Sequence, residues 1–544
     1  MHQVNPASGD TVEGLLARIE RLSAVGAALS SERNLDRLLE KILVAAMELT
    51  GADGGTLYRV REDGQALRFA IMHNDTLAIA LGGTSGQPID FPDLPLVKED
   101  GAPNDTLVAA WAVIHDCTIN IADAYSAAGF DFSGTRRFDE RTGYRSQSFL
   151  TVPMKNHENE IIGVLQLINA RDAHCGAVRP FSAADQRIAE SLASEAAIAL
   201  TNRLLIARLE ELFESFINLI NMAIDEKSPY TGGHCQRVPV LTMMIAEAVH
   251  ATTEGPLAGF CMSDADRYEL RIAGMLHDCG KITTPVHVVD KATKLHTLFD
   301  RIHLIDIRFE VVRRDAEIRM WRAIAGGLPE EMAREQYAVD ISGLNDDRDF
   351  LRHANIGSEA MTPADQERVR AIARRWRWQN ENGIETDFLT ENEVENLTIR
   401  AGTLTADERE VINHHIVATI RMLEALPWPK HLKRVPEFAG GHHERIDGKG
   451  YPRGLTGEQM SLQARMIAIA DIFEALTARD RPYKRGMKLS QAMGILANFA
   501  RNGHIDPQLF EVFVRQKVYL RYAEQFLDPA QIDDVDAGAL LSCG

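Results

Sequence analysis

Residues 440–454 read GGHHERIDGKGYPRG and place two adjacent histidines, His442 and His443, immediately before a turn. Imidazole nitrogens are frequent metal ligands. Gly448 and Gly450 give the following backbone freedom and Pro452 restricts it, so the turn is expected to hold one bend. Whether the histidine pair belongs to a metal site depends on the other donors that the chain supplies.

Further histidines and two aspartates stand in the C-terminal half of the chain. They are His234 in YTGGHCQRV, His277, Asp278 and Lys281 in MLHDCGKI, His414 and His415 in INHHI, and Asp471 in IAIADIFEALT. A lone histidine is more often structural, and His-Asp pairs are common on helix surfaces. Asp278 and Asp471, however, lie in apolar helical stretches, where an unpaired carboxylate costs several kcal/mol. Carboxylates and imidazoles that converge in such surroundings are best explained by a metal.

This donor set indicates the kind of metal site. Imidazole and carboxylate together suit Fe, Mn, Zn, Co or Ni, and the clusters contain no cysteine at a ligand position, which disfavours a structural zinc site of the cysteine type. The candidate ligands are too many for one ion that keeps an open position. Two ions about 4 Å apart are therefore favoured, with Asp278 as the candidate bridge, and such a centre suits in-line attack of water on phosphorus.

Length and composition limit the remaining possibilities. The chain has 544 residues, which predicts two or three domains, and its 45% hydrophobic and 25% charged residues are ordinary for a globular protein. The net charge of -19 argues against broad binding to nucleic acid or an anionic membrane. No apolar run approaches the roughly 20 residues of a membrane span. Without a signal-peptide pattern or CxxC spacing, we expect a reduced cytoplasmic protein.

The N-terminal part alternates helix and strand signals. Residues 15–49 have apolar positions at helical spacing, and GGTLYRVREDGQALRFAIMHN then predicts two strands around a DG turn. SFLTVPMKNHENEIIGVLQLIN predicts another strand pair, and Ser182 is a plausible N-cap for the helix that follows. Helix, antiparallel strands and helix are typical of an α+β domain.

Residues 15–205 resemble a GAF domain. GADGGTLYRV, RFDERTGYRSQSFLTVPM and GVLQLIN stand where that family has its strands and the loop over its ligand pocket. The resemblance implies a sensor for a small molecule. The stretch from Asn120 to Asp139 also resembles the asparagine–phenylalanine–aspartate signature of GAF domains that bind cyclic nucleotides. Because such residues also hold the fold together, a different ligand, or none, is the alternative expectation.

A long helix without Gly or Pro is predicted over residues 182–222. Its seam alternates spacings of four and three and consists of Leu205, Leu209, Leu212, Phe216 and Leu219. This pattern predicts a coiled-coil linker that pairs two chains, although an ordinary core-facing helix shows a similar stripe. A homodimer in which ligand binding changes helix packing is therefore expected.

Residues 223–525 are predicted to be almost entirely helical, and their motifs resemble a known family. His234, HD at 277–278 and Asp471 are similar to the HD superfamily of metal-dependent phosphohydrolases. HDCGK followed by HHERIDGKGYP resembles the HD-GYP family, bacterial phosphodiesterases that hydrolyse cyclic di-GMP; the match covers about 223–300 and 403–510. It implies an all-α HD-type domain with a binuclear site. The implied metal ligands are His234, His277, Asp278, His415, His442, His443 and Asp471.

The resemblance also assigns the neighbours of these ligands. Aligning LTADEREVINHH on its leading Leu-Thr selects His415 over His414. Lys281 is expected to neutralise phosphate oxygens as charge builds, with a surface lysine as the alternative. Residues expected to contact the substrate are Lys281, Gly450, Tyr451, Pro452, Arg481 and Lys484. The tyrosine suits stacking on a base, and an equal alternative is packing.

The sequence departs from the family pattern at several places. Tyr230 stands where some members have an acid for a third metal, so two metals are expected. Glu474 replaces an aspartate in DIFEALT, and TARDRPYK is one residue longer than usual. An insertion of about 100 residues spans roughly 296–402, including RVRAIARRWRWQN. Its basic residues and tryptophans are typical of nucleic-acid contact, but the acids nearby favour a folded cap or subunit contact.

Together these observations predict a GAF sensor (15–205), a helical linker (182–222) and an HD-GYP phosphodiesterase domain (223–525). The expected substrate is cyclic di-GMP and the expected first product is pGpG, while the sequence leaves open whether pGpG or GMP is the final product. Fe or Mn is the expected cofactor, with Ni, Co or Zn as alternatives. The GAF ligand is an unknown small molecule, for which a cyclic nucleotide is one candidate. A catalytically inactive receptor, or an enzyme for another cyclic dinucleotide, are the alternatives.

Overall fold

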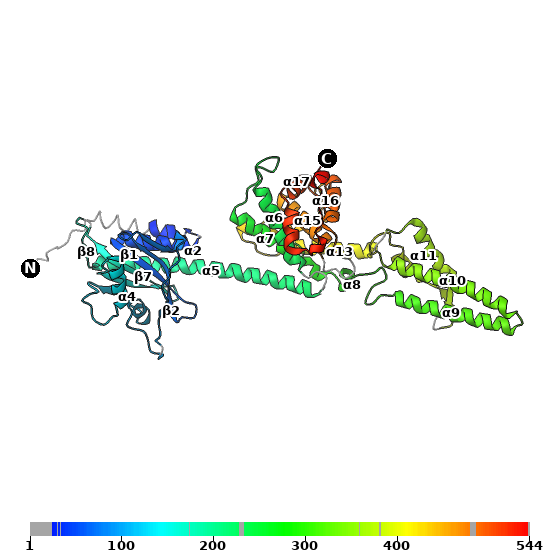
Figure 1. Ribbon diagram of the computed structural model, residues 1–544, viewed down its shortest axis with the longest axis horizontal. Coiled ribbons are helices and arrows are strands. Elements are labelled where there is room, and N and C mark those ends of the chain that lie inside the picture. The colour runs from blue at the N-terminus through cyan, green and yellow to red at the C-terminus, as the bar shows by residue number, and fades with distance from the viewer. Residues whose placement is uncertain are drawn as a thin grey trace, which may run out of the picture. The chain divides into compact units, whose positions relative to one another are not determined.

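The computed structural model describes residues 24–29, 31–32, 34–98, 100–172, 174–227, 233–357, 360–379, 382–478 and 486–541. The chain divides into two units, Met1–Phe213 and Glu214–Gly544 (Figure 1). The stretch predicted to be helical over 15–49 is not one helix where the structure describes it: residues 24–29 are helical, and α2 (Leu35–Thr50) begins after Asn34, whose extended backbone and side chain cap the helix. Residues 15–23 lie outside the described residues.

The N-terminal unit contains an antiparallel sheet. Its described strands follow the order β3-β2-β1-β7-β6-β5, with β4 paired to β2 and β8 to β7. The strands are β1 (Ala52–Val60), β2 (Ala66–Asn74), β3 (Ile79–Gly82), β4 (Leu94–Pro95), β5 (Ile119–Ile121), β6 (Phe149–Lys155), β7 (Ile161–Arg171) and β8 (Val178–Arg179). Both strand pairs predicted from the sequence are present, β1 with β2 and β6 with β7.

Helices pack on both faces of this sheet. Successive strand residues point to opposite faces, so each strand contributes side chains to both packing layers. Leu57 and Leu165 join the core that α2 and the start of α5 (Ala183–Lys227) complete. Their neighbours Tyr58 and Val164 face the other side and pack with residues of α3 (Val108–Ile114). Helix α4 (Ser133–Thr142) follows β5. The predicted α+β architecture is confirmed.

The C-terminal unit is largely helical, as predicted. Its helices are α6 (His234–His250), α7 (Asp264–Leu276), α8 (Val286–Val289), α9 (Ile302–Ala325), α10 (Glu330–Asn355), α11 (Pro363–Arg375), α12 (Glu391–Leu397), α13 (Ala406–Glu424), α14 (Val435–Gly440), α15 (Leu462–Thr477), α16 (Leu489–Arg501), α17 (Pro507–Arg515), α18 (Val518–Phe526) and α19 (Ala537–Leu541). The strands β9 (Arg377–Gln379) and β10 (Glu385–Asp387) pair as a short hairpin. Short 3-10 helices, η1 (Gly83–Ser85), η2 (Cys279–Thr283), η3 (Lys430–Leu432) and η4 (Pro529–Gln531), complete the elements.

Capping residues fix where the helices with candidate ligands begin. Thr405 and Glu408 form a capping box at α13, and the Ser461 side chain accepts a hydrogen bond from the backbone of α15. Such caps satisfy backbone N–H groups that have no partner within the helix. The N-terminal residues of α13 and α15 are thereby set, and with them the positions of their inward-facing side chains.

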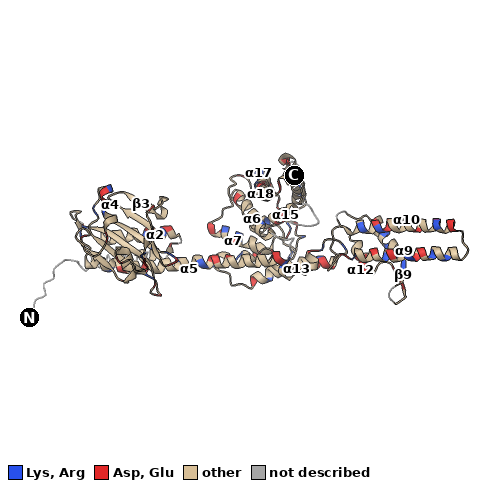
Figure 2. Cartoon of the chain, turned by 60° about the horizontal axis from the view of Figure 1, so that its bottom comes forward, with Lys and Arg blue, Asp and Glu red and all other residues tan. Residues whose placement is uncertain are grey.

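The segment from α9 to α12 has a hydrophobic core of its own. Phe309, Leu344, Val369 and Phe388 are among its buried members. Acidic and basic residues are interspersed along α9 and α10 (Figure 2). The region predicted as an insertion is thus folded around apolar residues.

The basic stretch at 368–380 is paired within this segment. Arg368 and Arg375 form ion pairs with Asp347, whose carboxylate also accepts a hydrogen bond from Trp376 Nε1 at 3.0 Å. Trp378 packs against the same core as Trp376. These side chains have structural partners, which weakens the nucleic-acid alternative for the stretch.

Across the described residues, no helix combines the length and the apolar character that crossing a membrane requires.

Candidate metal centre

Asp278 lies at the junction of two short elements. Helix α7 ends at Leu276, His277 is its C-cap, and Asp278 caps η2. A side chain at Gly280 would clash with the His415 carbonyl oxygen and would lie 2.5 Å from the Thr419 nitrogen. The absence of a side chain therefore lets η2 pack closely on α13. This contact brings Asp278 Oδ1 to 3.3 Å from His415 Nε2.

One cluster of candidate ligands surrounds the other oxygen of Asp278. His234 Nε2 lies 3.2 Å from Asp278 Oδ2 and 3.2 Å from Asp471 Oδ1. His277 Nε2 is 3.2 Å from Asp278 Oδ2 and 3.7 Å from Asp471 Oδ1. The potential ligand atoms of these four residues all lie within 4.8 Å of one another.

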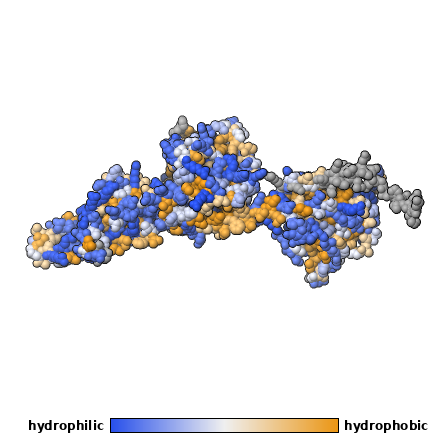
Figure 3. Space-filling model, turned by 180° about the vertical axis from the view of Figure 1, so that it is seen from behind, coloured by the Kyte–Doolittle hydropathy of each residue, from blue (hydrophilic) through white to orange (hydrophobic). Residues whose placement is uncertain are grey.

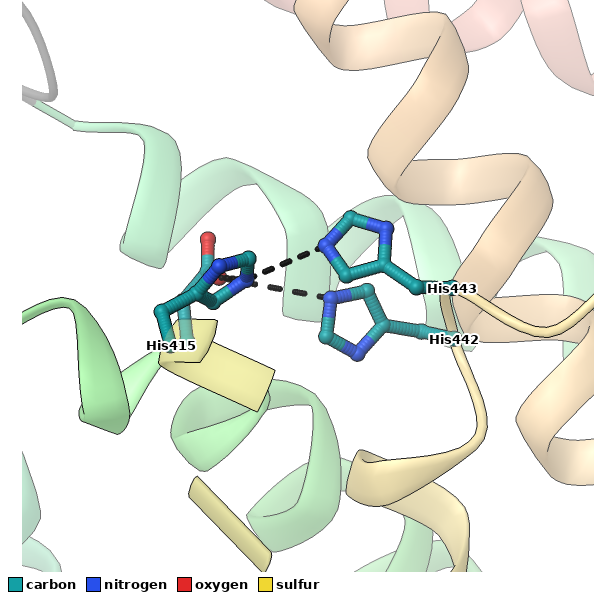
Figure 4. Close-up of side chains that lie close together, drawn as sticks. His415, His442 and His443 are labelled. Atoms are coloured by element: carbon teal, nitrogen blue, oxygen red, sulfur yellow. Dashed lines mark hydrogen bonds and ion pairs between the residues drawn. The ribbon is translucent and has the colours of Figure 1, made fainter. Parts of the chain in front are cut away.

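A second cluster combines Asp278 with three histidines. His415, His442 and His443 point toward one another in Figure 4. His443 Nε2 is 3.1 Å from His415 Nε2, and His442 Nε2 is 4.0 Å from Asp278 Oδ1. Within this second cluster, too, the potential ligand atoms lie within 4.8 Å of one another. Asp278 belongs to both clusters: its Oδ2 faces His234 and His277, and its Oδ1 faces His415 and His442.

Backbone contacts aim three of the imidazoles. In each, Nδ1 lies within hydrogen-bond distance of the carbonyl three residues earlier, which leaves Nε2 directed to the centre. The distances are 2.8 Å for His277 to Gly274, 2.5 Å for His415 to Ile412 and 2.6 Å for His442 to Ala439. A neutral imidazole whose Nδ1 is bonded in this way can bind a metal ion through Nε2.

Several buried atoms at the centre lack a hydrogen-bond partner within the described part of the chain. They are His234 Nε2, His277 Nε2, His442 Nε2 and Asp278 Oδ1. Such atoms are costly in a folded protein unless another group satisfies them. Converging imidazole nitrogens and carboxylate oxygens fit divalent metal ions, and the donor set includes no sulfur.

Burial and neighbouring charges shift the pKa of the Asp278 carboxyl and of the imidazoles around it, and the two histidine clusters differ in the direction of the shift. Burial would raise the pKa of the Asp278 carboxyl, but Lys281 and His277 outweigh burial and hold that pKa well below its usual range. Burial lowers the pKa of His443 to about 4 and that of His442 well below its usual value. Burial would also lower the pKa of His234 and His277, but the Asp278 and Asp471 carboxylates outweigh burial and raise the pKa of His234 well above its usual value and that of His277 to about 9. Metal binding needs a charged carboxylate and neutral imidazoles, so it would release protons from His234 and His277, whereas His442 and His443 are already neutral.

Lys281 contacts the proposed bridging residue. Its Nζ lies 2.5 Å from Asp278 Oδ2. The two residues lie three apart at the start of η2, and side chains at that spacing eclipse in a 3-10 helix. Burial lowers the pKa of Lys281, but Asp278 and Asp471 raise it above its usual value, so the side chain stays charged.

The turn after the histidine pair is held by close packing. A side chain at Gly450 would lie 2.5 Å from the Glu444 Cα, whereas Gly448 has a φ of 74°. The buried Glu444 carboxylate accepts hydrogen bonds from Arg453 N at 2.7 Å and Leu455 N at 2.9 Å. Tyr451 stacks on His443 with ring centroids 4.8 Å apart. Tyr451 thus has a packing contact, and base stacking stays a prediction.

The structure brings all seven predicted ligands together, while His414 is exposed on the outside of α13. Pro452 follows Tyr451 in the same turn. Arg481, Lys484 and Tyr230 lie outside the described residues, so their predicted roles remain predictions.

The contacts of one buried acid beside the candidate ligands were not identified from the sequence. Glu474 contacts His234 Nδ1 and accepts a hydrogen bond from Arg237 Nε at 2.7 Å. Its spacing of three residues from Asp471 on a helix was the available signal, because side chains at that spacing share a face.

The N-terminal unit contains a cavity of about 640 Å³. Its lining includes Tyr58, Phe69 and Phe149 from the sheet and Arg137 and Arg141 from α4. A concave site of this size suits a small molecule.

Both ends of the predicted nucleotide signature have structural partners. Asn120 Nδ2 donates to the Phe181 carbonyl at 3.1 Å, and Asp139 accepts hydrogen bonds from Tyr125 and Ser146. These contacts agree with a role in holding the fold, and the ligand stays open.

Three family models match the chain. A GAF domain model matches residues 34–200, and two HD domain models match residues 231–342 and 390–509. Both HD matches fall in the unit that holds the histidine clusters, and the GAF match falls in the unit with the sheet and cavity.

Curated relatives with sequence similarity carry the names of phosphodiesterases. The 3′3′-cGAMP-specific phosphodiesterase 1 of Vibrio cholerae is 52% identical over 81 residues, covering 15% of this chain and 19% of that protein. The cyclic di-GMP phosphodiesterase PA4108 of Pseudomonas aeruginosa is 43% identical over 116 residues, covering 21% and 27%. The V. cholerae 3′3′-cGAMP-specific phosphodiesterase 3 is 26% identical over 297 residues, covering 55% and 37%. The chain thus spans less than two fifths of each relative's length.

Proposed function

Since the chain carries a GAF domain followed by an HD domain of the HD-GYP type, we propose that it is a metal-dependent phosphodiesterase that hydrolyses a cyclic dinucleotide. The observation that carries the proposal is the shared carboxylate: Asp278 belongs to both ligand clusters. A carboxylate between two groups of imidazoles suits a binuclear centre for phosphoryl chemistry.

Each cluster would hold one divalent ion. His234, His277 and Asp471 would bind one ion, His415, His442 and His443 the other, and Asp278 would bridge them. The nitrogen and oxygen donors suit Fe or Mn, with Ni, Co or Zn as alternatives. When bound, such ions supply a water nucleophile at neutral pH and positive charge for the phosphoryl group.

The protein's own residues would orient the phosphodiester and stabilise charge. Lys281 keeps a positive charge beside Asp278, where it would pair with a non-bridging phosphate oxygen as negative charge builds. The Gly450–Pro452 turn borders the second cluster through the contact of Tyr451 with His443. A 3′-5′ phosphodiester would break with departure of the 3′ oxygen.

We propose cyclic di-GMP as the substrate and pGpG as the first product, with either pGpG or GMP as the final product. The names of five similar proteins, which describe cyclic di-GMP phosphodiesterases, support this choice. Three similar proteins are named for 3′3′-cGAMP, which makes that molecule the principal alternative. A receptor that binds the dinucleotide without turnover is the alternative from another class.

The test is a substrate panel with the full chain. Protein reconstituted with Fe(II) or Mn(II) would be incubated with cyclic di-GMP, 3′3′-cGAMP and linear dinucleotides, and products would be separated by chromatography. We expect metal-dependent pGpG or GMP, absent when His277 and Asp278 are both changed to Ala. Faster cleavage of 3′3′-cGAMP than of cyclic di-GMP would make 3′3′-cGAMP the preferred substrate. Tight binding of a dinucleotide without turnover under either metal would favour the receptor alternative.

The linker and cavity support a regulatory arrangement. A small molecule in the 640 Å³ cavity would change the packing of α5, the helix that runs from the sheet unit into the helical unit. Figure 3 shows hydrophobic surface along the stretch where Figure 1 places α5. We propose that two chains pair along this helix and that the pairing transmits the ligand signal.

A further inference from the structure

The four histidines whose Nε2 faces Asp278 are not oriented in the same way. His277, His415 and His442 each have Nδ1 on the carbonyl of a residue three positions earlier. His234 is the first residue of α6, so it has no preceding helical turn to supply that carbonyl. Its imidazole needs another partner if Nε2 is to stay directed to the centre.

Glu474 supplies that partner from a different helix. One carboxylate oxygen contacts His234 Nδ1, and the other accepts from Arg237 Nε and Nη2, both at 2.7 Å. The Glu474 side chain is 1% exposed, so water does not compete for these contacts. Both oxygens are occupied, which leaves the carboxylate one arrangement.

Asp471 lies three residues before Glu474 on α15 and touches the other nitrogen of the same ring. The Asp471 Oδ1 to His234 Nε2 distance is 3.2 Å. The two ring nitrogens of His234 therefore meet two carboxylates from one face of α15. Only one of them, Asp471, belongs to the ligand clusters.

We propose that Glu474 is a positioning residue that holds His234 with Nδ1 protonated and Nε2 free for a metal ion. This inference rests on the proposed binuclear centre. A carboxylate on the outer nitrogen fixes the tautomer and ring orientation and makes the inner nitrogen a stronger donor. Arg237, one turn after His234, holds the carboxylate in place.

The arrangement implies that the two ions respond differently to a change at position 474. The ion of the His234 cluster depends on Glu474 for one ligand. The His415 cluster has rings aimed by backbone carbonyls or by contacts between histidines, and Glu474 contacts none of them. Loss of the Glu474 carboxylate should therefore weaken one ion selectively.

The test measures metal content in the full chain. Wild type and Glu474→Gln would be loaded with Mn(II), dialysed against graded chelator and analysed for Mn per chain, with electron paramagnetic resonance to separate paired from single ions. We expect Glu474→Gln to lose one ion at chelator concentrations about 10- to 100-fold lower than wild type, leaving the signal of a single ion.

Two further variants separate positioning from stability. Glu393→Gln is the matched control, because Glu393 is also a buried glutamate paired with an arginine, Arg308, at 2.6 Å. It should lower stability without changing metal retention. Arg237→Gln keeps the contact between Glu474 and His234 and should weaken the same ion by less, and it provides the readout if Glu474→Gln fails to fold.

Each outcome bears on a separate statement. Equal chelator midpoints for wild type and both Glu474→Gln and Arg237→Gln, or simultaneous loss of both ions, would overturn the positioning role. Wild type that never retains two ions would refute the binuclear centre itself. Two retained ions without turnover of any dinucleotide would refute the proposed activity and leave the positioning result readable.

Discussion

Lys281 is the charged residue whose contribution to catalysis is most directly testable. Its ammonium group lies 2.5 Å from Asp278, and the Lys281 side chain as a whole is 23% exposed. Lys281→Met should lower kcat about 100-fold, because the transition state loses a positive charge near its non-bridging oxygens. Steady-state kinetics with saturating substrate would measure the change.

Metal content must be followed in the same samples. Lys433→Met removes an exposed lysine from the same unit and should leave both kcat and metal content unchanged. If Lys281→Met loses its metal together with its activity, the lysine acts by neutralising Asp278 instead of by stabilising the transition state.

Lys294 gives a pH-dependent prediction. Its ammonium is buried, donates to the Leu397 and Ile399 carbonyls at 3.2 and 2.7 Å and contacts Met361 Sδ at 3.0 Å. Burial lowers its pKa to about 8. Above about pH 8 the folded chain releases the Lys294 proton, whereas the unfolded chain keeps it up to the ordinary lysine pKa of about 10.4. Between these two pH values the unfolded chain binds more protons, so Lys294 makes the free energy of unfolding increase with pH.

Comparison with Lys294→Met would isolate the effect. The difference in unfolding free energy between wild type and variant should shift in favour of wild type by about 1–2 kcal/mol between about pH 7.5 and 9.5. Urea unfolding monitored by tryptophan fluorescence would measure this difference, because Trp376 and Trp378 pack against the hydrophobic cluster that contains Leu397, a hydrogen-bond partner of Lys294. A difference that stays constant with pH would contradict a lowered pKa.

Single site residues could be predicted from the sequence where they lie within a recognisable motif. The family resemblance of HDCGK, HHERIDGKGYP and the other motifs selected the seven candidate ligands that the structure brings together, and the alignment favoured His415 over the exposed His414. The partnership of Glu474 with His234 could not be read in this way. His234 and Glu474 lie 240 residues apart in the chain, so their contact depends on how α6 packs against α15.

At the scale of elements, the contact between η2 and α13 determines the centre. Gly280 has no room for a side chain beside the His415 carbonyl and Thr419, and Gly280 N donates to Thr419 Oγ1 at 2.9 Å. Gly280→Ala should push η2 away from α13. Because Asp278 belongs to both clusters, both ions should bind more weakly, and overpacking should cost about 1–3 kcal/mol of stability.

Gly494→Ala is the matched control. Gly494 lies inside α16, and a Cβ there would meet no atom within 4 Å. Alanine is the better helix former, so this change should stabilise the protein by roughly 0.5–1 kcal/mol. Urea denaturation and Mn content of both variants would decide, and a Gly280→Ala protein with normal metal content would show that the close contact is dispensable.

The elements themselves differed in how well the sequence predicted them. The β1–β2 and β6–β7 pairs followed from alternation and turn residues. The basic, tryptophan-containing stretch at 368–380 was ambiguous, because pairing of Arg368 and Arg375 with Asp347 depends on the packing of α10 against α11. Local composition does not report such a contact.

At the scale of the whole molecule, α5 carries an apolar stripe that the described residues leave exposed. Leu205, Leu209, Leu212, Phe216 and Leu219 are 46–63% exposed. The same alternation extends backwards through Asn202 to Ile198. A polar asparagine at one seam position fixes the register of paired helices at a cost in stability, which favours two copies aligned in parallel.

The pairing can be tested on the full chain by changing the seam alone. Leu209→Glu combined with Leu212→Glu would place like charges at the seam and should convert a dimer to a monomer, measured by light scattering during size-exclusion chromatography. Ala207→Glu adds a charge on the same exposed helix outside the seam and should leave the mass unchanged. If regulation acts through the paired helices, the monomer should also lose any response of its phosphodiesterase rate to a ligand of the cavity. A wild type that is monomeric at all concentrations would refute the pairing, and a monomeric variant with an unchanged ligand response would show that the signal passes along a single chain.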